Sequence, residues 1–211
     1  MIQGNSTQWT KFGEHMLQFE GKLSKNPNDT ASKCVQPGQY HTNRGVTYCT
    51  FKAYAEKLGV TPVTYQRFVA MNDNDAIKFL YLYYLDIKGD KLPDSVGLAL
   101  TNASWGSGPA RAKTELIMSL KKFGINAKNY DEAVEKSFSV PEKDLFNELV
   151  RIRENYFVNL GSSTQYASFL KGWLKRLDNF IEGFAPSKKK MILLPLAIFL
   201  IIFLIINKIK K

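Results

Sequence analysis

The chain has 211 residues, of which 45% are hydrophobic and 23% are charged, and this composition excludes a disordered or collagen-like protein. Two cysteines and two histidines exclude a disulfide-rich scaffold, a cysteine-rich zinc site and a histidine-based metal centre, so we expect no cofactor. The net charge is +10, but residues 188–211 contribute six lysines and no acid, which leaves 23 basic and 19 acidic side chains, or +4, for residues 1–187.

The N-terminal segment predicts an amphipathic helix that ends near Gly21. Ser6 or Thr7 can cap its first turn. Glu20 falls on the apolar face at the C-terminal end of this helix. The apolar residues of that face recur at spacings of three and four: Trp9, Phe12, Met16 and Phe19.

The next segment, residues 24–45, is rich in Pro, Gly, Asn, Ser and Thr and predicts a long loop or short irregular strands. A loop of this length in a compact domain is usually functional. The rest of the chain predicts a mainly α fold, with at most a small β-hairpin around residues 33–50. The predicted helices cover residues 50–58, 73–85, 93–106, 109–123, 130–138, 142–160 and 164–184.

The C-terminal tail predicts a membrane segment. Residues 191–206 contain no charged or hydrogen-bonding side chain. As a helix they extend roughly 24 Å, against about 30 Å for the hydrocarbon core, and flanking lysines can bridge the difference by snorkelling. We therefore predict a single C-terminal transmembrane helix over residues 191–207 after a basic linker at 185–190; a buried core helix is the alternative. No cleavable secretory signal is visible at the N-terminus.

Glu20 is the most informative candidate for chemistry. Apolar surroundings and the negative end of a helix dipole both disfavour a charged carboxylate. A carboxylic acid that keeps its proton near neutral pH can protonate a glycosidic oxygen as a general acid. The alternative is a glutamate at a helix end that points into solvent.

Other residues offer weaker signals, each with an ordinary structural alternative. Asp29 can hold a water or stabilise a positively charged sugar, and Thr42 can orient a nucleophilic water, but turn chemistry explains both equally well. Trp105, which precedes two glycines at a helix end, can stack on a sugar or pack in the core. Cys34 and Cys49 can form a disulfide or remain buried thiols. Basic and aromatic residues do not interleave as nucleic-acid binding requires.

Several short motifs occur in order between about residue 12 and residue 180. They are Phe19-Glu20-Gly21, Asn26-Pro27-Asn28-Asp29, His41-Thr42-Asn43-Arg44-Gly45-Val46-Thr47, Trp105-Gly106-Ser107-Gly108, Arg153 with Tyr156-Phe157, and Phe169 with Gly172-Trp173 and Arg176. Together they resemble glycoside hydrolase family 108 and its adjoining peptidoglycan-binding region. The chain departs from the family pattern at Lys22, Tyr40, His41 and Asn102, and its loop between Asp29 and Thr42 is longer.

The resemblance implies a lysozyme-like fold and a muramidase that cleaves the glycan strand of peptidoglycan. It implies a muramidase domain over residues 1–125 and a helical peptidoglycan-binding-like region, packed on it, over residues 126–184. It implies that Glu20 is the general acid, with Asp29 and Thr42 as its catalytic partners. The residues expected to bind the substrate are His41, Asn43, Asn102 and Trp105.

We therefore expect a membrane-anchored phage or phage-like muramidase, of the endolysin type, whose catalytic domain acts in the periplasm. Its expected partners are peptidoglycan and, through residues 191–207, membrane lipid, with no nucleic acid. The excess of lysine suits an anionic cell wall. One alternative is a non-catalytic wall-binding component of a virion or secretion machine, which the altered glycine loop favours. A second is an effector toxin delivered into rival cells.

Overall fold

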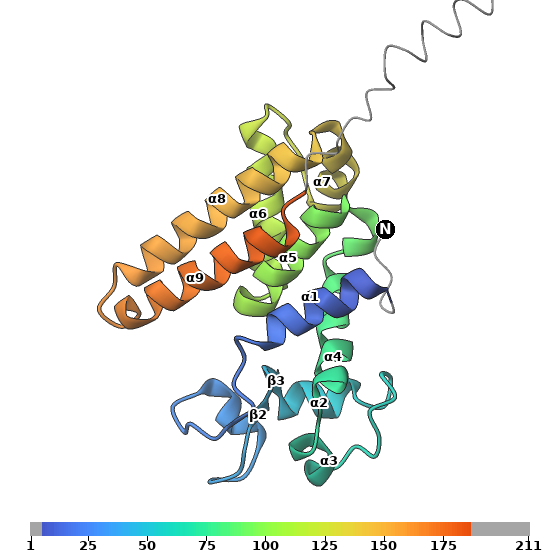
Figure 1. The fold of residues 1–211 in the computed structure, drawn as a ribbon, viewed down its shortest axis with the longest axis vertical. Helices are drawn as coiled ribbons and strands as arrows, with labels where there is room; N and C mark the ends of the chain where they lie inside the picture. Colours follow the sequence, from blue (N-terminus) through green and yellow to red (C-terminus); the bar gives the residue numbers. More distant parts are fainter. Residues whose placement is uncertain (1–5, 187–211) are drawn as a thin grey trace, which may run out of the picture.

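The computed structural model describes residues 6–186 of the protein. They form a mainly helical fold with one small antiparallel sheet, which confirms the predicted fold class of this part (Figure 1). Within these residues no helix combines the length and apolar character that crossing a membrane requires. The predicted membrane segment, residues 191–207, lies outside the described residues.

The first helix, α1 (Thr7–Leu17), starts where the sequence predicts but ends early. The Ser6 side chain accepts a hydrogen bond from the backbone N–H of Trp9 at 3.2 Å and caps the first turn. The predicted apolar face is buried, because Trp9, Phe12 and Met16 are at most 1% exposed. Glu20 follows in a turn, where its N–H donates to the Leu17 carbonyl at 3.1 Å. The prediction that Glu20 lies on the apolar face of this helix is therefore wrong.

A small lobe follows α1 and contains the sheet. The hairpin turn between its second and third strands consists of Arg44 and Gly45, whose φ angles of 51° and 79° are typical of a type I′ turn. This confirms the predicted hairpin. A further strand pairs with the hairpin and completes a three-stranded sheet. The strands, in sheet order, are β1 (Leu23–Ser24), β2 (Thr42–Asn43) and β3 (Val46–Thr47), and the short helices of the lobe are η1 (Thr30–Cys34), α2 (Tyr48–Tyr54) and α3 (Tyr65–Val69).

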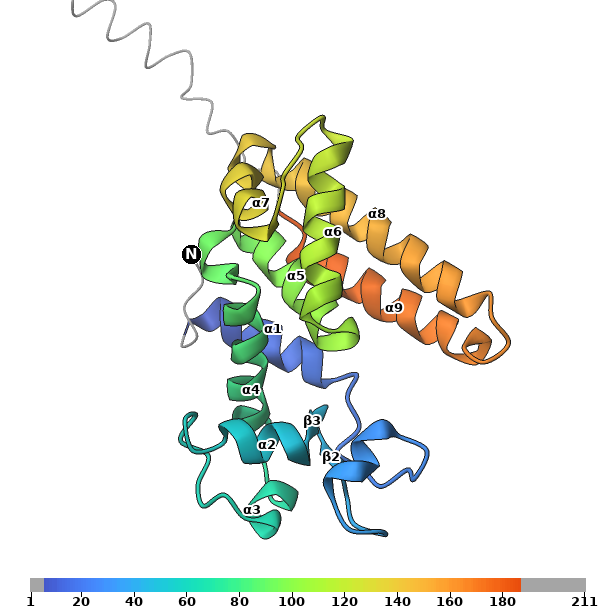
Figure 2. The same cartoon turned by 180° about the vertical axis from the view of Figure 1, so that it is seen from behind.

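The larger, helical part of the molecule matches the predicted helices to within a few residues. Figures 1 and 2 show α4 running from the small lobe into this part. Its elements are α4 (Asp73–Asp86), η2 (Gly89–Lys91), α5 (Asp94–Ser107), α6 (Pro109–Lys122), α7 (Tyr130–Lys136), η3 (Ser137–Ser139), α8 (Glu142–Gly161) and α9 (Ala167–Phe184).

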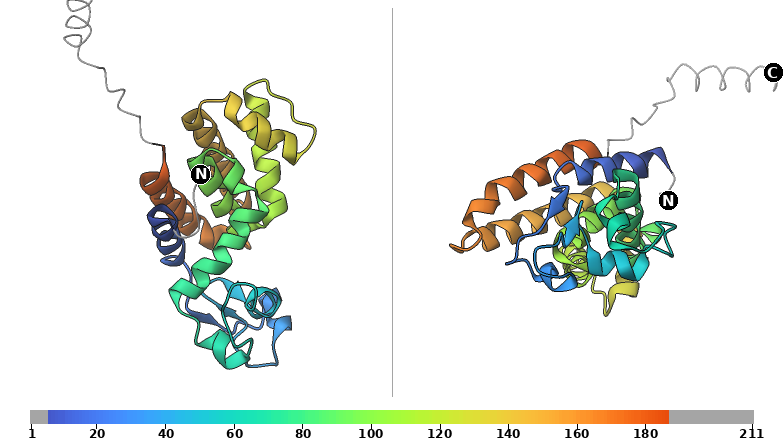
Figure 3. Two further views of the ribbon diagram at one scale, coloured as in Figure 1. Left: turned by 90° about the vertical axis from the view of Figure 1, so that its right-hand side faces the viewer. Right: turned by 90° about the horizontal axis from the view of Figure 1, so that it is seen from below.

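The last two helices share a core with the first. Phe180 of α9 lies 6.3 Å from Phe12 of α1 and 5.9 Å from Phe146 of α8, measured between ring centroids. Both views of Figure 3 show α9 beside α1. This packing places the C-terminal region against the N-terminal helix, and the domain boundary at residue 125 stays a prediction.

Cys34 and Cys49 form a disulfide, which is one of the two alternatives that the sequence left open. It ties η1 to the start of α2 across a separation of 15 residues. Closing a loop of about this length stabilises a protein by roughly 3 kcal/mol. We therefore expect the double variant Cys34→Ala, Cys49→Ala to lose about 3 kcal/mol of unfolding free energy in urea titrations. An unchanged midpoint would contradict this.

His15 of α1 makes the stability of the fold depend on pH. The rings of Phe19, Phe180 and Phe184 lie 5.2–6.2 Å from it, and its buried Nε2 has no hydrogen-bond partner among residues 6–186. Burial, followed by the charge of Arg176, lowers the pKa of His15 below its usual 6.5. The unfolded chain therefore binds a proton more readily than the folded one, and stability falls as the pH falls through about 6.5.

This effect is measurable by urea unfolding at about pH 7 and about pH 5. We expect the wild type to lose more stability between these pH values than the variant His15→Phe, which keeps an aromatic ring but cannot be protonated. An equal loss in both proteins would show that other groups dominate.

Candidate active site

Glu20 lies where the small lobe meets the helical part. Its side chain is 19% exposed. Its Oε1 atom accepts a hydrogen bond from the indole N–H of Trp105 at 3.0 Å and another from the guanidinium group of Arg176 at 2.8 Å. Trp105 is near the end of α5 and Arg176 is in α9, so two separate helices hold this carboxylate.

The hairpin turn closes over the other side of the same carboxylate. A Cβ atom on Gly45 would lie 3.1 Å from Glu20 Oε2 and 2.6 Å from Cζ2 of Trp105. Only glycine fits this close approach at a φ of +79°. Trp105 also meets the ring of Tyr83 edge-on at 5.0 Å. The indole is thereby held in the orientation in which it donates to Glu20.

The sequence led us to expect apolar surroundings for Glu20, but these surroundings include a cation. Arg176 forms an ion pair with Oε1 of Glu20 at 2.8 Å. A ligand that binds Arg176 therefore contacts the same side chain that orients this carboxylate.

Thr42 lies on the central strand of the sheet and is oriented by His41. The two side chains meet at 2.8 Å between Thr42 Oγ1 and His41 Nδ1, and His41 Nε2 lies 3.0 Å from the backbone carbonyl of Asn26. A carbonyl only accepts, so Nε2 carries the proton and Nδ1 accepts from the Thr42 hydroxyl. The lone pairs of Oγ1 are then directed away from His41. His41 is 1% exposed and supports Thr42 from within the fold, and its expected contact with the substrate stays a prediction.

Two further candidates, Asp29 and Asn43, form hydrogen bonds that stabilise the fold. Asp29 is exposed, and its Oδ1 accepts from the Ala31 N–H at 2.9 Å as the cap of η1, as turn chemistry predicted; its catalytic role stays a prediction. Asn43 is fully buried and donates to the carbonyls of Phe68 and Val69 at 2.8 and 3.1 Å. It links β2 to α3, and its expected contact with the substrate stays a prediction.

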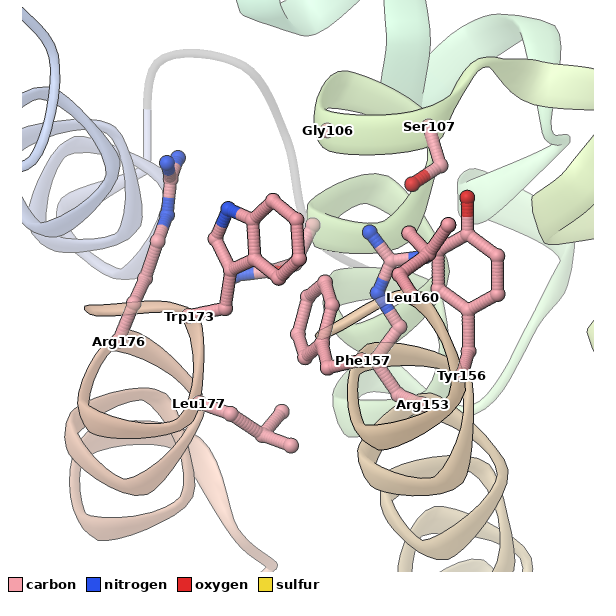
Figure 4. Close-up of a pocket in the computed structure, with 10 residues that line it drawn as sticks. Gly106, Ser107, Arg153, Tyr156, Phe157, Leu160, Trp173, Arg176 and Leu177 are labelled. Carbon is pink, nitrogen blue, oxygen red and sulfur yellow. The ribbon is translucent and has the colours of Figure 1, made fainter. Parts of the chain in front are cut away.

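A cavity of about 150 Å³, next to the ion-pair partner of Glu20, lies between the end of α5 and the helices α8 and α9 (Figure 4). Asn102 lines it, is 9% exposed and donates to the sulfur of Met16 at 3.2 Å. Arg176 lines it too. Sequence reasoning noted Arg176 as part of a motif but gave it no role, although its place in that motif was the available signal.

No group of three or more His, Cys, Asp and Glu side chains in residues 6–186 is placed to hold a metal ion. The groups that the site does bring together are a carboxylate, a hydroxyl and a guanidinium group.

Comparison with known proteins adds two findings. Residues 14–108 match the family model described as Glycosyl hydrolase 108, whereas no functionally curated protein matches the chain. The solved "Structure of Brucella abortus SagA" is similar, with a TM-score of 0.62 and 23% sequence identity over 86% of this chain and 97% of that one. The matched family region contains Glu20, Asp29, Thr42 and Trp105 but ends before α8 and α9.

Proposed function

Since residues 14–108 form a glycosyl hydrolase 108 domain and make this chain a glycoside hydrolase, we propose that it is an N-acetylmuramidase. The domain supports a lysozyme-like function in peptidoglycan hydrolysis. The observation that carries the proposal is the setting of Glu20, a half-buried carboxyl group whose orientation is fixed from both sides.

The acid step follows from this setting. Two donors already occupy Oε1 of Glu20, so we assign the transferable proton to Oε2, which faces Gly45. Glu20 gives this proton to the glycosidic oxygen as the bond from that oxygen to the anomeric carbon breaks. The departing sugar leaves as an alcohol, and the remaining sugar develops the positive charge of an oxocarbenium-like transition state.

The second step needs a water and a negative charge. The Thr42 hydroxyl donates a hydrogen bond to His41. Its oxygen is therefore free to accept a hydrogen bond from the attacking water and to orient that water. We assign Asp29 the role of stabilising the positively charged sugar. Glu20 regains its proton when the water attacks or in the exchange with solvent that follows.

Product analysis on purified peptidoglycan tests this proposal. A muramidase releases fragments that end in reducing N-acetylmuramic acid, so borohydride reduction followed by acid hydrolysis is expected to convert muramic acid into muramicitol. Reduced glucosamine instead would identify the other glycosidic bond as the target. If the enzyme forms no new reducing ends in purified peptidoglycan, the proposal is wrong.

We further propose that residues 191–207 anchor the enzyme in a membrane, with its catalytic domain in the periplasm, in a phage or phage-like lysis system. The apolar composition of the segment and its flanking lysines support this. The Cys34–Cys49 disulfide is typical of an oxidising compartment. We expect the full chain to stay with membranes washed in alkaline carbonate, and a variant that ends at Pro186 to be released. Release of both would contradict the anchor.

A further inference from the structure

The cavity next to Arg176, the ion-pair partner of Glu20, is positively charged and partly apolar. The stacked rings of Phe157 and Trp173 lie 5.5 Å apart at its wall. Figure 4 shows Trp173 between Arg176 and Phe157, with Arg153 beyond them. Two arginines and no acidic residue line the cavity within the described part of the chain.

Arg153 is buried without a full set of partners. Its side chain is 5% exposed, and its Nε has no hydrogen-bond partner among residues 6–186. Its terminal nitrogens reach only Glu115 Oε1 at 3.4 Å and the Ala103 carbonyl at 3.5 Å, which are long hydrogen bonds. Arg111 already holds Glu115 at 2.8 Å. Two guanidinium groups thus share one carboxylate, and one positive charge has no carboxylate of its own. The Arg153 guanidinium group also lies over the rings of Tyr156 and Phe157, at 5.2 and 4.6 Å, which attract a cation but accept no strong hydrogen bond.

This excess charge indicates the chemistry of the missing partner. Burial lowers the pKa of Arg153, which reports the cost of keeping this cation away from water. A guanidinium group in such a place is best matched by a carboxylate or phosphate, which its planar fork binds with two hydrogen bonds. The aromatic wall formed by Phe157 and Trp173 favours an anion that carries an alkyl group over a bare inorganic ion.

The volume of the cavity limits the size of the anion that it can bind. A cavity of about 150 Å³ accommodates a molecule as large as benzene, with roughly six heavy atoms. A carboxylate with its attached carbon and a methyl group, as at the end of an alanine-containing peptide, is of this size. The cavity therefore fits a short peptide carboxylate better than a sugar ring with its substituents.

The cavity also shares a residue with the candidate active site. Arg176 lines it and donates to Glu20 at 2.8 Å, so a group bound there lies one side chain away from the proposed acid. Peptidoglycan carries carboxylates on the stem peptides attached to its muramic acid residues. On the basis of the proposed function, we infer that this cavity binds a stem-peptide carboxylate between Arg153 and Arg176.

Binding there holds the strand next to Glu20. Arg176 donates to Oε1 of Glu20 at 2.8 Å, and a carboxylate in the cavity shares the same guanidinium group. A strand anchored by its stem peptide is therefore positioned at the proposed acid, and this positioning raises kcat/KM.

The test compares glycan strands that carry stem peptides with strands from which an amidase has removed them. We expect kcat/KM of the wild-type full chain to be about tenfold or more higher on the peptide-bearing strands, the range for a hydrogen-bonded ion pair. Equal rates overturn the inference but leave the proposed function standing, because bare strands are still cleaved. If neither substrate is cleaved, both are overturned.

Variants locate the effect in the cavity. Arg153→Gln is expected to cleave both substrates at similar rates, whereas Arg151→Gln, which alters an exposed arginine of the same helix outside this cavity, is expected to keep the preference. If Arg153→Gln does not fold, Ser107→Glu decides the question, because it places a carboxylate at the cavity wall and is expected to abolish the preference. A folded Arg153 or Ser107 variant that keeps the full preference overturns the inference.

Discussion

Replacing Glu20 with Gln is expected to lower the release of reducing ends from purified peptidoglycan by about 10²- to 10⁴-fold, the range for a lost general acid. The amide has the shape of the carboxyl group, and its oxygen can still accept from Trp105 and Arg176. It has no acidic proton to give to the leaving oxygen. The loss is therefore expected in kcat with the strand still bound, and time courses of reducing-end formation on sedimented peptidoglycan measure both.

The matched control for this variant is Glu14→Gln. Glu14 lies on α1, six residues earlier, and is exposed, so this variant removes the same charge away from the site. We expect it to keep wild-type activity. Far-ultraviolet circular dichroism and thermal unfolding establish that both variants are folded. Undiminished cleavage by folded Glu20→Gln would reject the assignment of the acid.

The helical framework was predictable because its signals are local. Asn72 and Asp75, for example, form a reciprocal capping box at the start of α4, which the sequence places within one residue. The apolar spacing of α1 likewise identified Trp9, Phe12 and Met16 as core residues. Caps and periodicity act over three or four residues, so a single sequence is sufficient to find them.

The setting of Glu20 was not predictable in the same way, because its partners are remote. Trp105 and Arg176 lie 85 and 156 positions further along the chain, and no local pattern reports such pairs. The helix ends at Leu17, and the carboxylate of Glu20 in the following turn contacts both of them. The same remoteness explains why the expected apolar surroundings of Glu20 proved to include a cation.

The polar residues around the sheet differ in how deeply they are buried. His41 and Asn43 flank Thr42; the sequence predicted that Thr42 orients a water and that its two neighbours bind the substrate. Strand alternation would direct Thr42 to one face and its two neighbours to the other. The structure buries His41 and Asn43, which bond to backbone carbonyls of Asn26, Phe68 and Val69. A sequence shows which residues share a face but not which face is covered.

The largest effect expected from a residue without a functional group is that of Gly45→Ala. A methyl group there would lie 2.6 Å from Trp105 Cζ2 and 3.1 Å from Glu20 Oε2, so the indole must move or the hairpin turn must open. We expect a loss of about 1–2 kcal/mol from the left-handed backbone and a further 1–3 kcal/mol from overpacking. Displacement of Trp105 misplaces the acid, and an activity loss on the order of 10²-fold follows even in the folded fraction.

Gly38→Ala separates the backbone cost from the steric one. Gly38 has a φ of +84°, close to the +79° of Gly45, but nothing in the described chain lies within 4 Å of the position its Cβ would take. We expect this variant to lose about 1–2 kcal/mol of stability and no activity, because it strains a loop without touching Glu20 or Trp105. Activities measured at a temperature where both variants are folded give the comparison. If the two variants lose activity equally, the hairpin turn acts through the stability of the small lobe, and its contact with Glu20 does not orient the acid.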